Sequence, residues 1–274
     1  MPSMLIDVHT HVFPADSAEK ILSTVKERAQ ISSYSDGTVK GLRDSMAKAG
    51  IDISFISRIT TNPEQVESVN QWLLAHCKSN IFAFATIHPD MKMPQDYIKK
   101  LRQRGFKGIK VHPDYQGFYA DDFRMYPYYE AAQIEKMPIL FHAGLDRGLP
   151  PPARALPERL GKLLKDFPRL TIIAAHMGGE DNYEDTETSL LGSDIFLDTS
   201  FVLRLMSKTM LKRFVMKHST ERIFFGSDSP WKEQREELEY LFSLPFISDE
   251  AKEKIVGKNA ARLFGLRKIR GWTR

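Results

Sequence analysis

The amino-acid sequence predicts an α/β protein of the (β/α)8 TIM-barrel class, with residues 1–274 in one domain and a helical insertion after the first strand. Three observations predict this class. Apolar runs of strand length, rich in β-branched residues, recur eight times. Segments of helical periodicity separate most of them. After the first unit, successive strands end at intervals of roughly 30 residues, as in a closed barrel of about 250 residues. No segment of linker composition interrupts the series, which favours a single domain.

The eight predicted strands read as near-continuous apolar runs, as in a parallel sheet that helices cover. They are residues 4–11, 53–60, 81–88, 108–112, 138–143, 170–176, 195–199 and 222–228.

Apolar residues at three- and four-residue intervals predict the outer helices. These are residues 62–79, 95–104, 122–136, 153–167 and 206–218, followed by two closing helices at 232–242 and 249–264. The connection over residues 13–51 is long enough for two helices. A long loop after a barrel strand is a candidate lid or substrate wall, so we expect one there and another at residues 143–153.

Composition is typical of a soluble globular protein, with 42% hydrophobic and 27% charged residues. The sequence shows no leader pattern and no apolar run of membrane-spanning length, which predicts a cytoplasmic protein without membrane association. The net charge is +4 and the pI is about 9.0, but basic and acidic residues are interspersed on most predicted helices. This pattern disfavours nucleic-acid binding and leaves anionic small molecules as expected ligands. Barrels of this class often form symmetric dimers through their outer helices, so the sequence is compatible with a homodimer.

The first predicted strand carries two histidines separated by one residue. Because alternate residues of a strand share a face, Asp7, His9 and His11 are expected to point together into the barrel mouth. Two imidazoles at this spacing can chelate one metal ion. The motif alone is unspecific, since chance gives it in roughly a fifth of chains with this histidine content.

Four other predicted strands also end in residues that can bind metal ions, namely His112, His142, His176 and Asp228. In barrels of this class the carboxyl ends of the strands form the active site, so these residues are expected to converge. Nitrogen and oxygen ligands without cysteine suit zinc, and also manganese or iron, with positions left open for water and substrate.

Together these motifs resemble the amidohydrolase superfamily, specifically its amidohydrolase-related group of hydrolases, lactonases and non-oxidative decarboxylases. The resemblance covers nearly the whole chain and rests on residues 6–11 (IDVHTH), 108–113 (GIKVHP), 141–144 (FHAG), 175–179 (AHMGG), 225–230 (FGSDSP) and 257–264 (GKNAARLF).

The resemblance implies one or two bound ions. His9, His11 and Asp228 would hold the primary ion, with His142 completing that site or shared with a second ion. His176 would be a ligand in a two-metal site, whereas in a one-metal site it would orient or polarise the water or substrate. Asp228 would bind the ion and also act as the base.

Lys110 shares its strand face with His112, which places a charged amine inside the barrel. Related barrels bridge two ions with a carboxylated lysine on this strand, so Lys110 is a ligand if carboxylated. The alternatives are a lysine paired with Asp7 or with an anionic substrate. His112 is either a substrate or proton-transfer contact or a structural histidine.

Three arginines near strand ends, Arg58, Arg147 and Arg204, are candidates for binding a substrate carboxylate through paired hydrogen bonds. The alternative for each is a surface or helix-capping role.

The function expected first is metal-dependent hydrolysis of an amide, ester or lactone of a small, possibly anionic substrate, with Asp228 moving the proton. The alternative is metal-dependent, non-oxidative decarboxylation of an unsaturated or aromatic acid. A barrel that binds without catalysis is the third possibility. The sequence does not identify the substrate, because the shape of the loops determines it.

Overall fold

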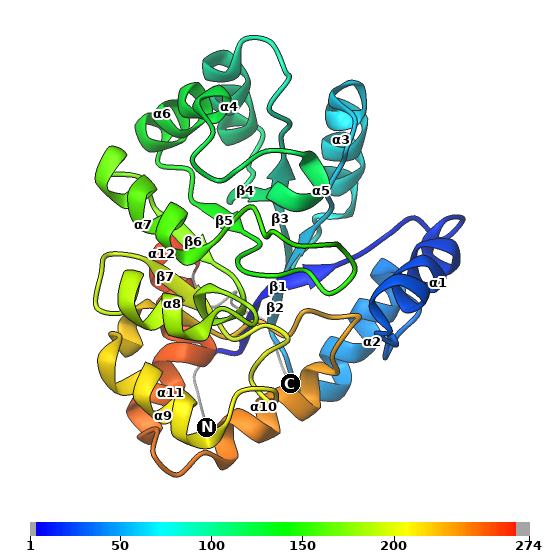
Figure 1. Cartoon of the computed structure of the whole chain (residues 1–274). Coiled ribbons are helices and arrows are strands. Elements are labelled where there is room, and N and C mark those ends of the chain that lie inside the picture. Colours follow the sequence, from blue (N-terminus) through cyan, green and yellow to red (C-terminus); the bar gives the residue numbers. More distant parts are fainter. Residues whose placement is uncertain (1–3, 267–274) are drawn as a thin grey trace.

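A computed structural model describes residues 4–266 and contains eight parallel strands paired in sequence order, which confirms the predicted TIM barrel (Figure 1). The strands are β1 (Ile6–His11), β2 (Ile53–Ser57), β3 (Ile81–Thr86), β4 (Gly108–Val111), β5 (Ile139–Phe141), β6 (Ile172–Ala174), β7 (Phe196–Asp198) and β8 (Ile223–Phe224).

The barrel closes between its first and last strands. The Val8 amide donates to the carbonyl of Phe225 at 3.0 Å, and the Asp228 amide donates to the carbonyl of His9 at 2.9 Å. A parallel bridge between Thr10 and Ser229 continues this pairing. The seam therefore lies beside the residues that the sequence predicts as metal ligands.

Helices surround the strands and alternate with them, as predicted. They include α1 (Ala18–Ala29), α2 (Val39–Ala49), α3 (Val66–His76), α4 (Pro94–Gln103), α6 (Tyr126–Glu135), α7 (Pro157–Asp166), α9 (Lys208–Lys217), α10 (Gln234–Ser243), α11 (Asp249–Glu253) and α12 (Asn259–Phe264). The two helices expected within residues 13–51 are α1 and α2, and α1 stands out from the ring of helices in dark blue (Figure 1).

Two short helices were not predicted, α5 (Pro113–Gln116) and α8 (Tyr183–Ser189). The second has seven residues, of which only Thr186 is buried. A single buried position gives no three- or four-residue apolar repeat, so periodicity does not reveal such a helix.

The barrel interior is apolar at the end opposite the predicted site. Phe55, Phe84 and Phe224 belong to one buried cluster with Phe264 of α12, whose ring centre lies 4.5 Å from that of Phe55. Gly257 packs against the chain just before β1, where a β-carbon would lie 2.0 Å from the carbonyl oxygen of Met4. The C-terminal segment therefore covers the end at which the strands begin, and the other end is left for the polar residues.

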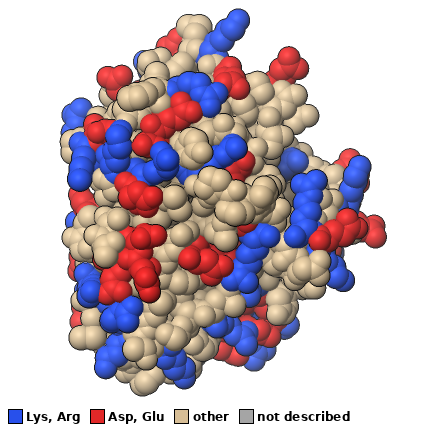
Figure 2. Space-filling model, viewed as in Figure 1, with Lys and Arg blue, Asp and Glu red and all other residues tan. Residues whose placement is uncertain are grey.

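Positive and negative side chains are interspersed over the face shown in Figure 2. Within residues 4–266, no helix has both the length and the apolar character that a membrane crossing requires.

Candidate metal centre and substrate pocket

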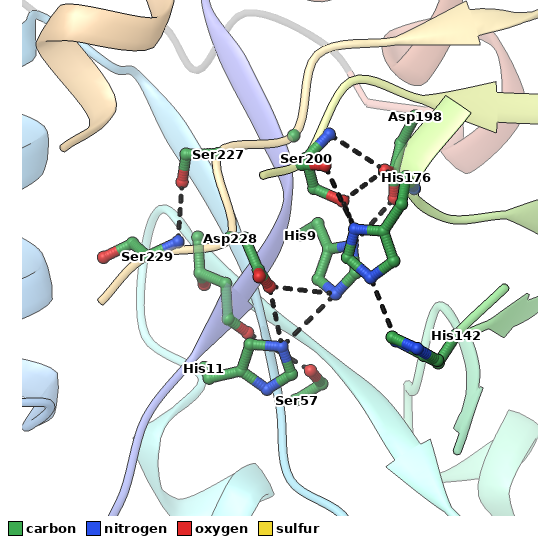
Figure 3. A network of polar contacts seen from close by, with 12 residues as sticks. His9, His11, Ser57, His142, His176, Asp198, Ser200, Ser227, Asp228 and Ser229 are labelled. Atoms are coloured by element: carbon green, nitrogen blue, oxygen red, sulfur yellow. Dashed lines mark hydrogen bonds and ion pairs between the residues drawn. The ribbon is translucent and has the colours of Figure 1, made fainter. Parts of the chain in front are cut away.

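Three predicted ligands meet at the barrel seam. The Nε2 atoms of His9 and His11 are 3.2 Å apart, and Oδ1 of Asp228 lies 3.5 Å from the first and 3.1 Å from the second (Figure 3). Ligands held about 2.1 Å from one ion are separated by about 3.0–3.4 Å in octahedral or tetrahedral geometry. The three side chains, which we call the seam triad, therefore fit a single divalent ion.

Asp198, at the end of β7, orients one ligand of the seam triad. Its Oδ2 accepts a hydrogen bond from Nδ1 of His9 at 2.8 Å. Because a carboxylate only accepts, the proton of a neutral His9 is on Nδ1 and the lone pair of Nε2 faces the other ligands. Burial, followed by the charge of Lys110, lowers the pKa of His9 to about 4, so the imidazole is neutral at pH 7. The ligand is thus ready to bind a metal ion.

Sequence reasoning missed Asp198. Burial would raise its pKa, but the charge of His9 and hydrogen bonds from His9 and Ser200 outweigh burial and keep the pKa well below its usual range. An acidic residue inside a predicted apolar strand was the available signal, since a buried carboxylate needs partners.

His176 and His142 form a second hydrogen-bonded chain. Nδ1 of His176 lies 3.0 Å from the carbonyl oxygen of Ser200, which can only accept, so a neutral His176 carries its proton there. Its Nε2 then accepts from Nδ1 of His142 at 3.0 Å. This leaves Nε2 of His142 with a free lone pair, and that buried atom has no hydrogen-bond partner among the described residues.

A second group of two histidines and one aspartate, which we call the stacked triad, consists of His112, His142 and Asp146. The two imidazole rings are 4.0 Å apart and nearly parallel, at 9°. Nε2 of His112 is already bonded to Oδ2 of Asp146 at 3.1 Å. An imidazole binds an ion in the plane of its ring, so two parallel rings cannot both direct lone pairs at one ion. The stacked triad is therefore a poor metal site in this arrangement.

Lys110 is buried and its Nζ lies 3.0 Å from Nε2 of His9. Burial lowers its pKa to about 8, although the charges of Asp198 and Asp228 oppose the shift. The structure does not contain the alternative pairing with Asp7.

Asp7 does not point into the barrel mouth, so that prediction was wrong. It accepts hydrogen bonds from Ser227 and from Gln234 of α10. The pairing of β1 with β2 shifts between Asp7 and Thr10, and this irregularity breaks the alternation that the prediction assumed. Burial raises the pKa of Asp7 to about 6.

A cavity of about 380 Å³ opens in front of both triads. Its wall includes the aromatic side chains of Phe13, Tyr115, Phe201 and Trp231. The helix α1 closes one side, as expected for the long connection after the first strand. The pocket suits a small, flat molecule with a polar end.

The three candidate arginines lie in different places. Arg147 lines the cavity, but its Nε donates to Oε1 of Glu180 at 2.7 Å. Arg58 is not among the lining residues and stacks over the ring of Trp72, with 4.9 Å from its guanidinium carbon to the ring centre. Arg204 pairs with Glu236. None of the three therefore presents a free guanidinium to the cavity.

Several residues around the cavity have left-handed backbone conformations. His176, Phe201 and Asp228 have φ angles of 57°, 64° and 69°. These conformations are uncommon for residues other than glycine and often mark functional positions. They turn the chain sharply where β6, β7 and β8 end, which brings all three side chains to the cavity.

Comparisons with known proteins agree with this architecture. The family model described as amidohydrolase matches residues 6–266. A search of curated protein sequences finds no significant match.

Solved structures match over 96% of the chain. A 5-carboxyvanillate decarboxylase from Novosphingobium aromaticivorans, solved with manganese and a nitrobenzoic acid, is 15% identical, with a TM-score of 0.70 and 96% of its own chain covered. A 2,6-dihydroxybenzoate decarboxylase from Rhizobium is 17% identical, with a TM-score of 0.69 and 98% covered. An uncharacterised TIM-barrel protein from Bordetella bronchiseptica is 19% identical, with a TM-score of 0.75 and 98% covered.

These findings correct the expected chemistry. The named enzymes among the similar structures are mostly decarboxylases, so the hydrolase expectation was wrong and the alternative fits better. Manganese, rather than zinc, is the metal named in these structures. The family match covers almost the whole chain, and the chain therefore belongs to the amidohydrolase family and is an enzyme of the amidohydrolase superfamily.

Proposed function

We propose that this protein is a metal-dependent, non-oxidative decarboxylase of aromatic or unsaturated carboxylic acids, and that manganese is its ion. The observation that carries the proposal is the seam triad, a one-ion cluster that opens into a cavity with aromatic walls. The decarboxylases with the same barrel support the choice of reaction. The substrate is a small molecule.

His9, His11 and Asp228 would hold the ion. When bound, the ion supplies positive charge that binds the substrate's carboxylate and lowers the cost of negative charge on the reacting ring. Asp228 keeps its own negative charge, because hydrogen bonding and attraction from the neighbouring histidines outweigh burial and hold its pKa well below its usual range. Its role is therefore to bind the ion and to orient His11, rather than to supply a proton.

In the reaction, the bond between the ring carbon and the carboxylate breaks, carbon dioxide leaves and one proton is added to the carbon. We assign delivery of that proton to the doubly protonated form of His176, which carries a proton on Nε2 as well as on Nδ1 and lines the cavity. Ser200 holds the opposite nitrogen at 3.0 Å and so fixes the ring orientation. After delivery, Nε2 of neutral His176 accepts the hydrogen bond from Nδ1 of His142, and a proton from water restores the doubly protonated form. Phe201 and Trp231 line the same cavity and would pack against the substrate's ring.

The test is carbon dioxide release from the Mn²⁺-loaded protein with a panel of aromatic acids that includes 2,6-dihydroxybenzoate and 5-carboxyvanillate. We expect equal amounts of carbon dioxide and decarboxylated product for at least one acid, and loss of both after chelation. Bound Mn²⁺ without carbon dioxide release from any member of the panel would contradict the proposal.

A further inference from the structure

Helix α1 presents two parallel rows of side chains to the cavity. Lys20, Thr24 and Arg28 form one row, and Ile21, Val25 and Ala29 form the other. Each row has a spacing of four residues, which places its members along one face of a helix. One face of α1 is therefore polar and cationic, the neighbouring face is apolar, and both line the same pocket.

Within residues 4–266, the cations of the polar row have no carboxylate partner and lie apart from the other two cations of the cavity. Arg147 is paired with Glu180, and Lys110 lies against His9 near the seam triad. Among residues 4–266, neither Lys20 nor Arg28 makes an ion pair or a side-chain hydrogen bond with another residue. Both side chains are exposed. Their charges are therefore available to a ligand.

Arg28 faces the side of the cavity formed by Tyr115 and residues 146–148. A β-carbon at Gly148 would lie 3.5 Å from Cβ of Ala29 and 3.6 Å from the hydroxyl of Tyr115, so the end of α1 reaches this loop. Burial raises the pKa of Tyr115 to about 12, and the charge of Arg28 opposes that shift, which agrees with their proximity. The seam triad lies elsewhere, at β1 and β8, so the cavity has two separate positions for negative charge.

We propose that Arg28 binds a second anionic group of the substrate, while Lys20, about two helical turns away in the same row, adds positive charge to this wall, so that the pocket selects aromatic acids with two negative groups over those with one. The apolar row packs against the ring, and the planar guanidinium forms paired hydrogen bonds with the distal carboxylate. The inference rests on the proposed function, in which the seam triad and its ion bind the first carboxylate.

The experiment measures binding rather than turnover. Dissociation constants of benzoate, with one carboxylate, and isophthalate, with two, are determined by calorimetry on the Mn²⁺-loaded protein. The variants are Arg28→Met, Arg28→Lys and the matched control Lys26→Met. Lys26 is a cation in the same last helical turn but does not line the cavity, so its loss changes the helix charge equally.

We expect the wild-type protein to bind isophthalate about tenfold more tightly than benzoate, as for one partly exposed charge-assisted contact. Arg28→Met should remove this preference and change benzoate binding by less than about twofold. Arg28→Lys should keep part of the preference, and Lys26→Met should keep all of it.

Equal losses for the two ligands in Arg28→Met, an unchanged preference, or no preference in the wild-type protein would each overturn the inference. Failure of the proposed function is distinguishable, because it would show as absent carbon dioxide release while the Arg28-dependent preference for isophthalate remained. Release of carbon dioxide without that preference would refute only the role of Arg28.

Discussion

The seam triad and the stacked triad contain the same residue types, two histidines and one aspartate, yet only the first fits a metal ion. In the seam triad the rings are tilted by 54° and three ligand atoms face one another. In the stacked triad the rings are parallel, and Asp146 and His176 already occupy one nitrogen of each ring. Ligand identity and proximity therefore do not make a metal site unless the lone pairs are also oriented toward one point.

The difference originates in the residues behind each triad. Asp198 holds His9 through Nδ1, away from the position of the ion, and so frees Nε2. No comparable acceptor stands behind His112, whose buried Nδ1 has no partner within the described chain. Partners on the far side of a ring thus decide whether its other nitrogen is available.

The largest effect is expected from Asp228→Asn, which would break the seam triad. The amide lacks the charge that binds the ion, so Mn²⁺ content should fall well below one per chain and carbon dioxide release should fall at least about 10³-fold. Elemental analysis and a product assay measure the two quantities. Full activity in this variant would show that Asp228 is not required for metal binding or catalysis.

A buried carboxyl that belongs to neither triad should contribute to the pH dependence of stability. Glu237 of α10 is 1% exposed and has no hydrogen-bond partner for either oxygen among the described residues. Burial raises its pKa from 4.5 to about 7. Since the folded state retains this proton at higher pH than the unfolded state does, Glu237 destabilises the fold increasingly as pH rises from about 4.5 to about 7.

The variant Glu237→Gln tests this. Relative to the wild-type protein, its free energy of unfolding should increase by about 2 kcal/mol between pH 5 and pH 8, because glutamine does not titrate. Urea unfolding at the two pH values gives the difference. Parallel pH profiles for the two proteins would show that Glu237 ionises normally in the fold.

Asp198→Asn changes the residue that accepts the hydrogen bond from Nδ1 of His9 and leaves all three residues of the seam triad in place. It should weaken Mn²⁺ binding about 10- to 100-fold while the three ligands stay in place. Titration with Mn²⁺ measures the affinity. An unchanged dissociation constant would mean that His9 keeps its orientation without the Asp198 carboxylate.

The smallest effect is expected from Asp146→Asn in the stacked triad. The wild-type protein should hold close to one Mn²⁺ per chain, and this variant should hold the same amount, with an affinity changed less than about threefold. Elemental analysis and titration measure both. Two ions in the wild-type protein, with one lost in the variant, would contradict our interpretation of the stacked triad.

Most of the barrel could be predicted because its signals are local. Apolar strands such as residues 170–176 and helices such as residues 95–104 carry their periodicity in the sequence, and each strand-end ligand sits at a recognisable boundary. Asp7 was misplaced because a strand irregularity depends on the neighbouring strand. Arg28 was missed because the end of α1 lies near the distant residue Gly148, a tertiary proximity that local periodicity does not reveal.

The order of ligands along the chain has a consequence for biosynthesis. His9 and Asp228 lie on opposite sides of the barrel seam and are separated by more than two hundred residues. A ribosome must therefore add more than two hundred residues after His9 before the seam triad can assemble. The nascent chain therefore cannot bind the ion at an early stage. The apolar layers have to fold the barrel first, so metal binding is a late step that requires the completed fold.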